Sequence, residues 1–215
     1  MAKLEHFVPF LIRWEAGVIG AGLTNEQLFE KARAKGYGND PVDSGGPTMV
    51  GVTLITYKSY CREKGLPVPG IPELRAIPYE QWFDLVKTMF WDHLKADEIN
   101  NQSLAELCVD TVWGSGTGYI KNIQKVIGVT PDGTVGPKTL KKLNQEPCYP
   151  TFQKLWMARK EFFEQIVANS IAAYEKKLGH LATEQQKLKY TKKKFLRGWM
   201  NRLNSLVFTP TDSQD

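Results

Sequence analysis

The sequence predicts a mainly α-helical protein with one small β-rich loop region. Apolar residues recur at helical spacing along most of the 215 residues, and alternation of apolar and polar residues nowhere persists beyond a few positions. Residues 36–51, rich in Gly, Pro, Asn and Asp, are too irregular for a long helix and suit turns or a short hairpin. Hydrophobic residues at 42% exclude a disordered or fibrous chain, and the length suits one well-buried core.

Capping residues and prolines divide the first half of the chain into expected helices. The first helix should bury an apolar stripe from Leu4 to Trp14 and end near Glu15, where the chain enters a loop. Thr24 and Gln27 have the spacing of a capping box, and Gly36 stops the helix that they start. Capping or proline residues also start three further helices, expected at residues 53–64, 78–91 and 103–113, the last with Ser103 and Glu106 as its capping box.

The second half of the chain should also be helical. Short helices at residues 119–127 and 137–143 flank a Pro-Asp-Gly turn. Pro150 starts the longest amphipathic stretch, which ends near Gly179, and a last helix carries apolar residues from Phe195 to Leu206. We therefore expect a single domain over residues 1–208 and a disordered tail at residues 209–215.

Charge is distributed unevenly along the chain. The net charge is +5, but residues 1–120 carry −4 and residues 121–215 carry +9. A cationic half suits a polyanionic partner such as nucleic acid, an anionic membrane or the carboxylate-bearing cell wall. The simpler alternative is a solvated helix face, and residues 187–194 have the composition of an exposed turn. No sequence motif for reading nucleic acid accompanies the charge, so we expect no nucleic-acid partner.

Several protein classes are disfavoured. The three cysteines are widely spaced without a C-x-x-C pair, so we expect reduced thiols and no metal site. The histidines lie far apart without a Ser or Cys elbow, which disfavours a triad hydrolase, and no phosphate-binding glycine loop follows a strand. Neither a convincing signal peptide nor a transmembrane stretch is present, so we expect cytoplasmic synthesis without stable membrane insertion.

Two acidic regions could carry chemistry. In the loop NDPVDSGGPT, Asp40 and Asp43 fit a turn in which each carboxylate bonds its own backbone; a calcium loop is weaker because its usual ligand alternation is missing. Glu15 could simply be solvated at its helix end, but apolar neighbours such as Trp14 favour the protonated carboxyl that a general acid needs. Glycoside hydrolysis requires such a pair, one acid and one base or nucleophile.

The segments WEAG, NDPVDSGGPTMVGVT, VDTVWGSG, IQKVIGVTPDGTVGPKT and FLRGWMNR resemble the glycoside hydrolase family 108 muramidases. The resemblance runs in the family's order from about residue 4 to residue 206. It implies a lysozyme-like α+β fold and a bacterial or prophage enzyme that hydrolyses the β-1,4 bond after N-acetylmuramic acid. Residues 120–143 are similar to peptidoglycan-binding repeats, here expected to be fused within the domain with a possible role in wall binding.

The resemblance assigns roles to individual residues. The family's catalytic glutamate falls on Glu15, and the Asp and Thr that follow on a hairpin in phage-type lysozymes fall on Asp43 and Thr48. Asp40 is a reserve carboxylate near the substrate. Trp113 and Tyr119 could stack on sugar faces.

This sequence departs from the family pattern at three places. Ala16 stands where the family has Gly, about twenty residues (18–38) are inserted before the NDP loop, and Gly114 stands where the family has Asn. A surface helix can absorb the insertion because longer loops cost little closure entropy. At Gly114 the missing amide would remove a hydrogen bond to a sugar N-acetyl group or to a catalytic loop, and in that case Gly114→Asn should raise activity. The interpretation that we favour is that Gly114 serves the tight bend of the sequence WGSG, with a glycine there for positive φ.

The expected function is an N-acetylmuramidase that acts on peptidoglycan glycan strands as a monomer without a cofactor. The alternatives are a lytic transglycosylase, which needs one acid and no positioned water, and an inactive wall-binding module. Without a signal peptide, the enzyme would reach the wall through a holin or a dedicated secretion channel.

Overall fold

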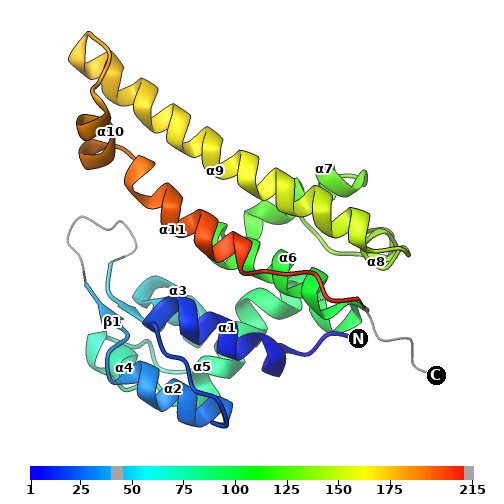
Figure 1. Ribbon diagram of the computed structural model, residues 1–215. Helices are drawn as coiled ribbons and strands as arrows, with labels where there is room; N and C mark the ends of the chain where they lie inside the picture. The colour runs from blue at the N-terminus through cyan, green and yellow to red at the C-terminus, as the bar shows by residue number, and fades with distance from the viewer. Residues whose placement is uncertain (40–45, 211–215) are drawn as a thin grey trace. The chain divides into compact units, whose positions relative to one another are not determined.

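Helices make up most of both halves of the chain in the computed structural model, which describes residues 1–39 and 46–210 (Figure 1). Contacts within the chain divide it into two compact units, residues 1–98 and 99–215. A mainly α fold with a small sheet is therefore confirmed, whereas the single domain over residues 1–208 stays a prediction.

The first unit combines short helices with a three-stranded antiparallel sheet in the order β1-β2-β3. In the sheet, Tyr37 pairs with Met49 and Thr48 pairs with Thr53, so the predicted hairpin is confirmed. The elements are α1 (Leu4–Ala16), α2 (Asn25–Arg33), β1 (Tyr37–Gly38), β2 (Thr48–Met49), β3 (Val52–Thr53), α3 (Leu54–Glu63), α4 (Ile71–Arg75), α5 (Tyr79–Val86), a π-helical turn (Lys87–Trp91) and two 3-10 turns (Asp92–Leu94 and Ala96–Glu98).

Local capping explains where these helices begin. Thr24 and Gln27 form the predicted capping box of α2, with the Gln27 N–H bonded to the Thr24 hydroxyl at 3.2 Å. Thr53 caps α3 by accepting the Thr56 N–H at 3.1 Å. The expected continuous helix over residues 78–91 is wrong at its end, because α5 gives way at Lys87 to a π-helical turn in which Trp91 is fully buried.

The second unit is built along one helix of 30 residues, α9 (Tyr149–Leu178), against which α6, α7 and α11 pack (Figure 1). Gly179 ends α9 in the left-handed conformation with φ 73°, as its place after the amphipathic stretch predicted. The other elements are α6 (Gln102–Ser115), a 3-10 turn (Thr117–Tyr119), α7 (Ile120–Ile127), α8 (Pro137–Leu143), α10 (Glu184–Tyr190) and α11 (Lys193–Asn204).

Three expectations for the second unit need correction. Asn101, not Ser103, caps α6 by accepting the Leu104 N–H at 2.9 Å, and the Ser103 hydroxyl instead accepts the Thr209 N–H at 2.9 Å. That bond also holds Thr209, which we expected in the tail, whereas residues 211–215 lie outside the described part of the chain. Residues 187–194 are not one exposed turn, since a capping box at Thr183 starts a separate helix, α10.

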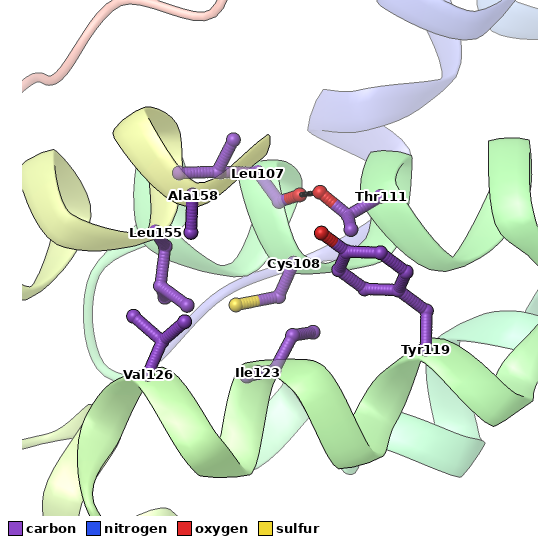
Figure 2. Close-up of a pocket in the computed structure, with 8 residues that line it drawn as sticks. All are labelled: Leu107, Cys108, Thr111, Tyr119, Ile123, Val126, Leu155 and Ala158. Carbon is purple, nitrogen blue, oxygen red and sulfur yellow. Dashed lines mark hydrogen bonds between the residues drawn. The ribbon is translucent and has the colours of Figure 1, made fainter. Parts of the chain in front are cut away.

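Figure 2 shows the small core cavity of the second unit, which is lined by Cys108 and Tyr119 among eight residues from α6, α7, α9 and the 3-10 turn. Its volume of about 10 Å³ is room for one water at most, so it is a packing gap and not a substrate pocket. Burial raises the pKa of the Cys108 thiol to about 12, which keeps it protonated and unreactive.

Candidate active site

Glu15 lies in the last turn of α1, where Gly17 ends the helix in the left-handed conformation at φ 62°. The Gly17 N–H bonds the carbonyl of Arg13 at 2.9 Å, which fixes the exit of the chain beside Glu15. The Glu15 side chain is half-buried and follows Trp14, over whose ring the Arg13 guanidinium lies at 5.8 Å. The expected position of Glu15 at a helix end is confirmed.

The end of α1 meets the hairpin at Gly36. A Cβ atom at Gly36 would lie 3.4 Å from the Cβ of Ala16, 2.9 Å from the Cγ2 of Val50 and 2.7 Å from the carbonyl oxygen of Ala32. The Val50 N–H donates to the carbonyl of Gly36 at 3.0 Å. Gly36 is thus the point where the residue after Glu15, the end of α2 and the start of the sheet come together.

Thr48 lies on the central strand of this sheet and is half-buried. Its hydroxyl donates to the carbonyl of Gly46 at 3.0 Å, so its proton is directed back into the loop. The Thr48 oxygen therefore keeps its lone pairs as acceptors for a further donor. Asp40 and Asp43, the two carboxylates expected in the loop before it, lie outside the described residues.

A buried tryptophan supports the hairpin beneath Thr48. Val50 is fully buried at φ 44°, a backbone conformation that β-branched residues rarely adopt. The Trp82 indole N–H donates to the carbonyl of Val50 at 3.1 Å, and the Trp82 ring packs on Phe29 of α2 at 5.1 Å between centroids. Sequence reasoning missed Val50 and Trp82, because no local pattern signals a bond across 32 residues.

In the second unit, Trp113 lies half-buried near the end of α6. Gly114 is not where the helix turns, since the positive φ of 79° belongs to Gly116. A Cβ at Gly114 would instead meet the Nη2 of Arg159 at 2.9 Å. The expectation that Gly114 serves a tight bend is therefore wrong: the side chain of Arg159 needs the space.

Arg159 organises the end of α6 from within α9. Its Nη1 donates to the Ser115 hydroxyl at 2.6 Å, its guanidinium lies 4.3 Å from the Phe163 ring centroid, and the residue is 4% exposed. Burial lowers the pKa of Arg159, opposed by Tyr119 and Asp110, yet an arginine stays charged. Sequence reasoning missed Arg159, which looked like one polar position in an amphipathic helix.

Tyr119 faces the same guanidinium at 5.2 Å and meets Phe162 edge-on at 4.8 Å. It is 9% exposed, and burial raises the pKa of its hydroxyl although Arg159 opposes the shift. Its ring is thus enclosed by side chains of its own unit, which argues against stacking on a sugar.

The described residues offer neither a metal cluster nor a membrane span. Over residues 1–39 and 46–210, no three His, Cys, Asp or Glu side chains are grouped so that they could hold a metal ion. Within that same part of the chain, no helix is long and apolar enough to cross a membrane.

Comparison with known proteins identifies two segments. Residues 32–116 match the family model described as glycosyl hydrolase 108, and residues 119–204 match the one described as a predicted peptidoglycan domain. The first match begins after Glu15, so the family model does not cover that residue.

A solved structure, that of Brucella abortus SagA, has 23% sequence identity with this chain and a TM-score of 0.59. The match covers 83% of this chain and 90% of that chain, and at this identity it shows the fold. No curated protein matches. The chain therefore carries a glycosyl hydrolase 108 domain at residues 32–116, followed by a predicted peptidoglycan domain at residues 119–204, and the two together support a peptidoglycan hydrolase.

Proposed function

We propose that the protein is an N-acetylmuramidase that cleaves the β-1,4 bond between N-acetylmuramic acid and N-acetylglucosamine, with Glu15 as general acid. The packing at Gly36 carries this proposal, because it brings the helix end with Glu15 against the sheet that carries Thr48. A catalytic acid and a water-binding hydroxyl must approach the same bond, and they need a rigid support to do so.

The reaction needs one proton donated and one accepted. Protonated Glu15 gives its proton to the glycosidic oxygen while the bond from that oxygen to the anomeric carbon breaks. Water adds to the anomeric carbon, and Asp43 takes the proton that the water loses. Glu15 is left as a carboxylate and regains a proton from solvent, and Asp43 releases its proton to solvent, so both groups are ready for the next cycle.

Thr48 suits a role in holding the attacking water. Its hydroxyl proton goes to Gly46, so its oxygen accepts one proton of the water, while a carboxylate at position 43 accepts the other. The water then presents a lone pair to the anomeric carbon. A threonine that donated its proton to the water would instead occupy one of the two lone pairs of that water.

Trp113 is the aromatic side chain that we propose for contact with a sugar face, and Asp40 is the reserve carboxylate. Tyr119 leaves the proposed set because its ring is buried against Arg159 and Phe162. Glycan strands of the wall are the proposed partner of a monomeric enzyme without a cofactor. We further propose that a holin or a secretion channel releases it.

Glu15→Gln tests the assignment. The amide fills the same space but cannot protonate an oxygen, so we expect hydrolysis of purified peptidoglycan to fall about a hundredfold or more at unchanged melting temperature. Glu5→Gln is the matched control, because Glu5 is exposed on the same helix and should keep full activity. Turnover by a folded Glu15→Gln protein within a few fold of the wild type would remove Glu15 from the mechanism.

The chemistry of the products distinguishes a muramidase from a lytic transglycosylase. A lytic transglycosylase leaves a 1,6-anhydro end, whereas a muramidase adds water and leaves a reducing end. Mass spectrometry of the released fragments distinguishes the two, and a clear lack of release in zymography would leave an inactive wall-binding module.

A further inference from the structure

One end of the second unit, where α9 ends and α10 follows, carries a dense positive charge. We call residues 174–197 the basic tip; they comprise the last turn of α9, the loop after it, α10 and the start of α11 (Figure 1). The tip holds eight Lys and Arg and two Glu, a net charge of +6 against +5 for the whole chain. The rest of the molecule is therefore close to neutral.

The basic tip is an ordered structure. The Tyr174 and Tyr190 rings stack at 5.5 Å, the Glu175 carboxylate accepts the Ala182 N–H at 3.0 Å, and the Ser170 hydroxyl accepts the Lys192 N–H at 2.9 Å. These contacts tie the loop and α10 to α9. The charges are thus held on one folded element.

Few of the positive charges are neutralised internally. Both glutamates are paired: Glu175 with Lys187 at 3.7 Å, and Glu184 with Lys187 at 3.4 Å and with Lys193. Within the described residues, no ion pair involves the six remaining basic side chains, which are Lys176, Lys177, Lys189, Lys192, Lys194 and Arg197.

Large apolar side chains lie among these charges. Leu181 is 81% exposed, Leu188 51%, Tyr190 55% and Phe195 42%, and α10 has no buried residue. The ammonium groups of Lys192 and Lys194 lie 5.6 Å and 4.7 Å from the Phe195 ring centroid, and that of Lys189 lies 5.1 Å from the Tyr190 ring centroid. Cations and exposed apolar groups are therefore interspersed along the basic tip.

We propose that the basic tip docks the protein on the headgroup region of an anionic phospholipid bilayer, without a membrane span. Net positive charge draws the tip to the negative surface, and the exposed leucines and aromatic rings then leave water at the boundary between headgroups and acyl chains. Charge alone would equally fit the wall or a nucleic acid. The two exposed leucines would bury no apolar surface on those hydrophilic polymers, whereas a lipid surface would bury it.

Flotation with large unilamellar vesicles tests the proposal. The full chain should bind vesicles that contain phosphatidylglycerol and not pure phosphatidylcholine, and added salt should weaken the binding. Replacing Lys189, Lys192 and Lys194 with Gln together should reduce partition about a hundredfold, at roughly fivefold per charge. Gln at Lys125, Lys138 and Lys141, three exposed lysines of the same unit, is the matched control and should change binding little.

The apolar contribution needs its own pair of variants. Leu181→Ser with Leu188→Ser should weaken partition into phosphatidylglycerol vesicles about tenfold or more. Ile55→Ser with Val68→Ser removes two apolar side chains that are 67% and 56% exposed on the first unit, and this control should bind like the wild type. Melting temperatures of all variants confirm that each is folded.

Binding to purified sacculi and to duplex DNA completes the test. The proposal is supported if the tip variants lose vesicle binding while sacculus hydrolysis at matched concentration is unchanged. It is overturned if wild-type protein ignores anionic vesicles, if the leucine variants bind as tightly as wild type, or if the losses fall on sacculi or DNA instead. Activity of Glu15→Gln does not enter these readouts, so failure here leaves the proposed function intact.

Discussion

Gly36→Ala should damage both the fold and the site, and its effect can be worked out from three distances. The new methyl group would lie 2.7 Å from a backbone oxygen of α2, 2.9 Å from the Val50 side chain and 3.4 Å from the methyl of Ala16. Relief would require α2, the hairpin or the end of α1 to move. Overpacking of this kind costs about 1 to 3 kcal/mol, which lowers the melting temperature of a chain of this size by roughly 2 to 12 °C.

Gly38→Ala is the matched control, two residues further along the same segment. A methyl group there meets no atom within 4 Å, and Gly38 does not have the positive φ that favours glycine. We expect its melting temperature to stay within about 2 °C of the wild type, since surface substitutions change stability by about 0.5 kcal/mol or less.

Activity separates a damaged site from general destabilisation. If Gly36 sets the distance between Glu15 and Thr48, peptidoglycan hydrolysis at a temperature where Gly36→Ala is fully folded should still fall about tenfold or more, because small misplacements of catalytic groups are costly. Calorimetry and turbidity loss of sacculi measure the two effects. Wild-type stability and wild-type hydrolysis in Gly36→Ala would refute the packing that we assign to this position.

Three other predictions concern single side chains. Gly114→Asn should lower stability by about 1 kcal/mol and raise no activity, because it displaces the Arg159 guanidinium; a several-fold faster hydrolysis would contradict this. Asp43→Asn should be severely impaired in sacculus hydrolysis and Asp40→Asn much milder, whereas the reverse order would make Asp40 the base. Burial raises the pKa of Glu106 from 4.5 to about 7, opposed by its bond from Gln102, so the folded state holds this proton more tightly than the unfolded state. That stabilisation is complete below about pH 4.5 and is lost as pH rises through about 7, roughly 3 kcal/mol in all. Melting curves at pH 5 and pH 8 test this prediction, and the Glu106→Gln protein should be more stable than the wild type at pH 8. If the melting temperatures of the two proteins change equally between pH 5 and pH 8, Glu106 does not have the raised pKa.

Much of the fold could be predicted because its signals are local. A capping box needs two side chains three residues apart, and Thr24 with Gln27 supplies one without help from the rest of the chain. The same logic missed α10, whose capping box at Thr183 lies just before the lysine-rich residues 187–194, which we interpreted by their charge. At α6 the cap is Asn101, and the hydroxyl of Ser103, which lies inside the helix, instead accepts the Thr209 N–H.

The site could be predicted in its residue types and not in its assembly. The spacing of apolar residues placed Glu15 at a helix end, and the loop composition together with the family resemblance placed Thr48 on a hairpin; the structure confirms both positions. What joins them is a glycine between α2 and the sheet, together with a strained Val50 held by Trp82. Gly36 looked like an ordinary helix stop, since nothing near it in the sequence shows which atoms approach it in space.

Gly114 shows the same limit more sharply. Judged by its neighbours Trp113, Ser115 and Gly116, a glycine there suited a bend, and one residue in this run does have positive φ. The constraint on Gly114 instead comes from a side chain 45 positions later, because Arg159 is buried, bonded to Ser115 and stacked on Phe163. A larger residue at position 114 would compete with that guanidinium for one space. Restoring the family's Asn should therefore harm this protein, because the added side chain would displace the Arg159 guanidinium from its contacts with Ser115 and Phe163.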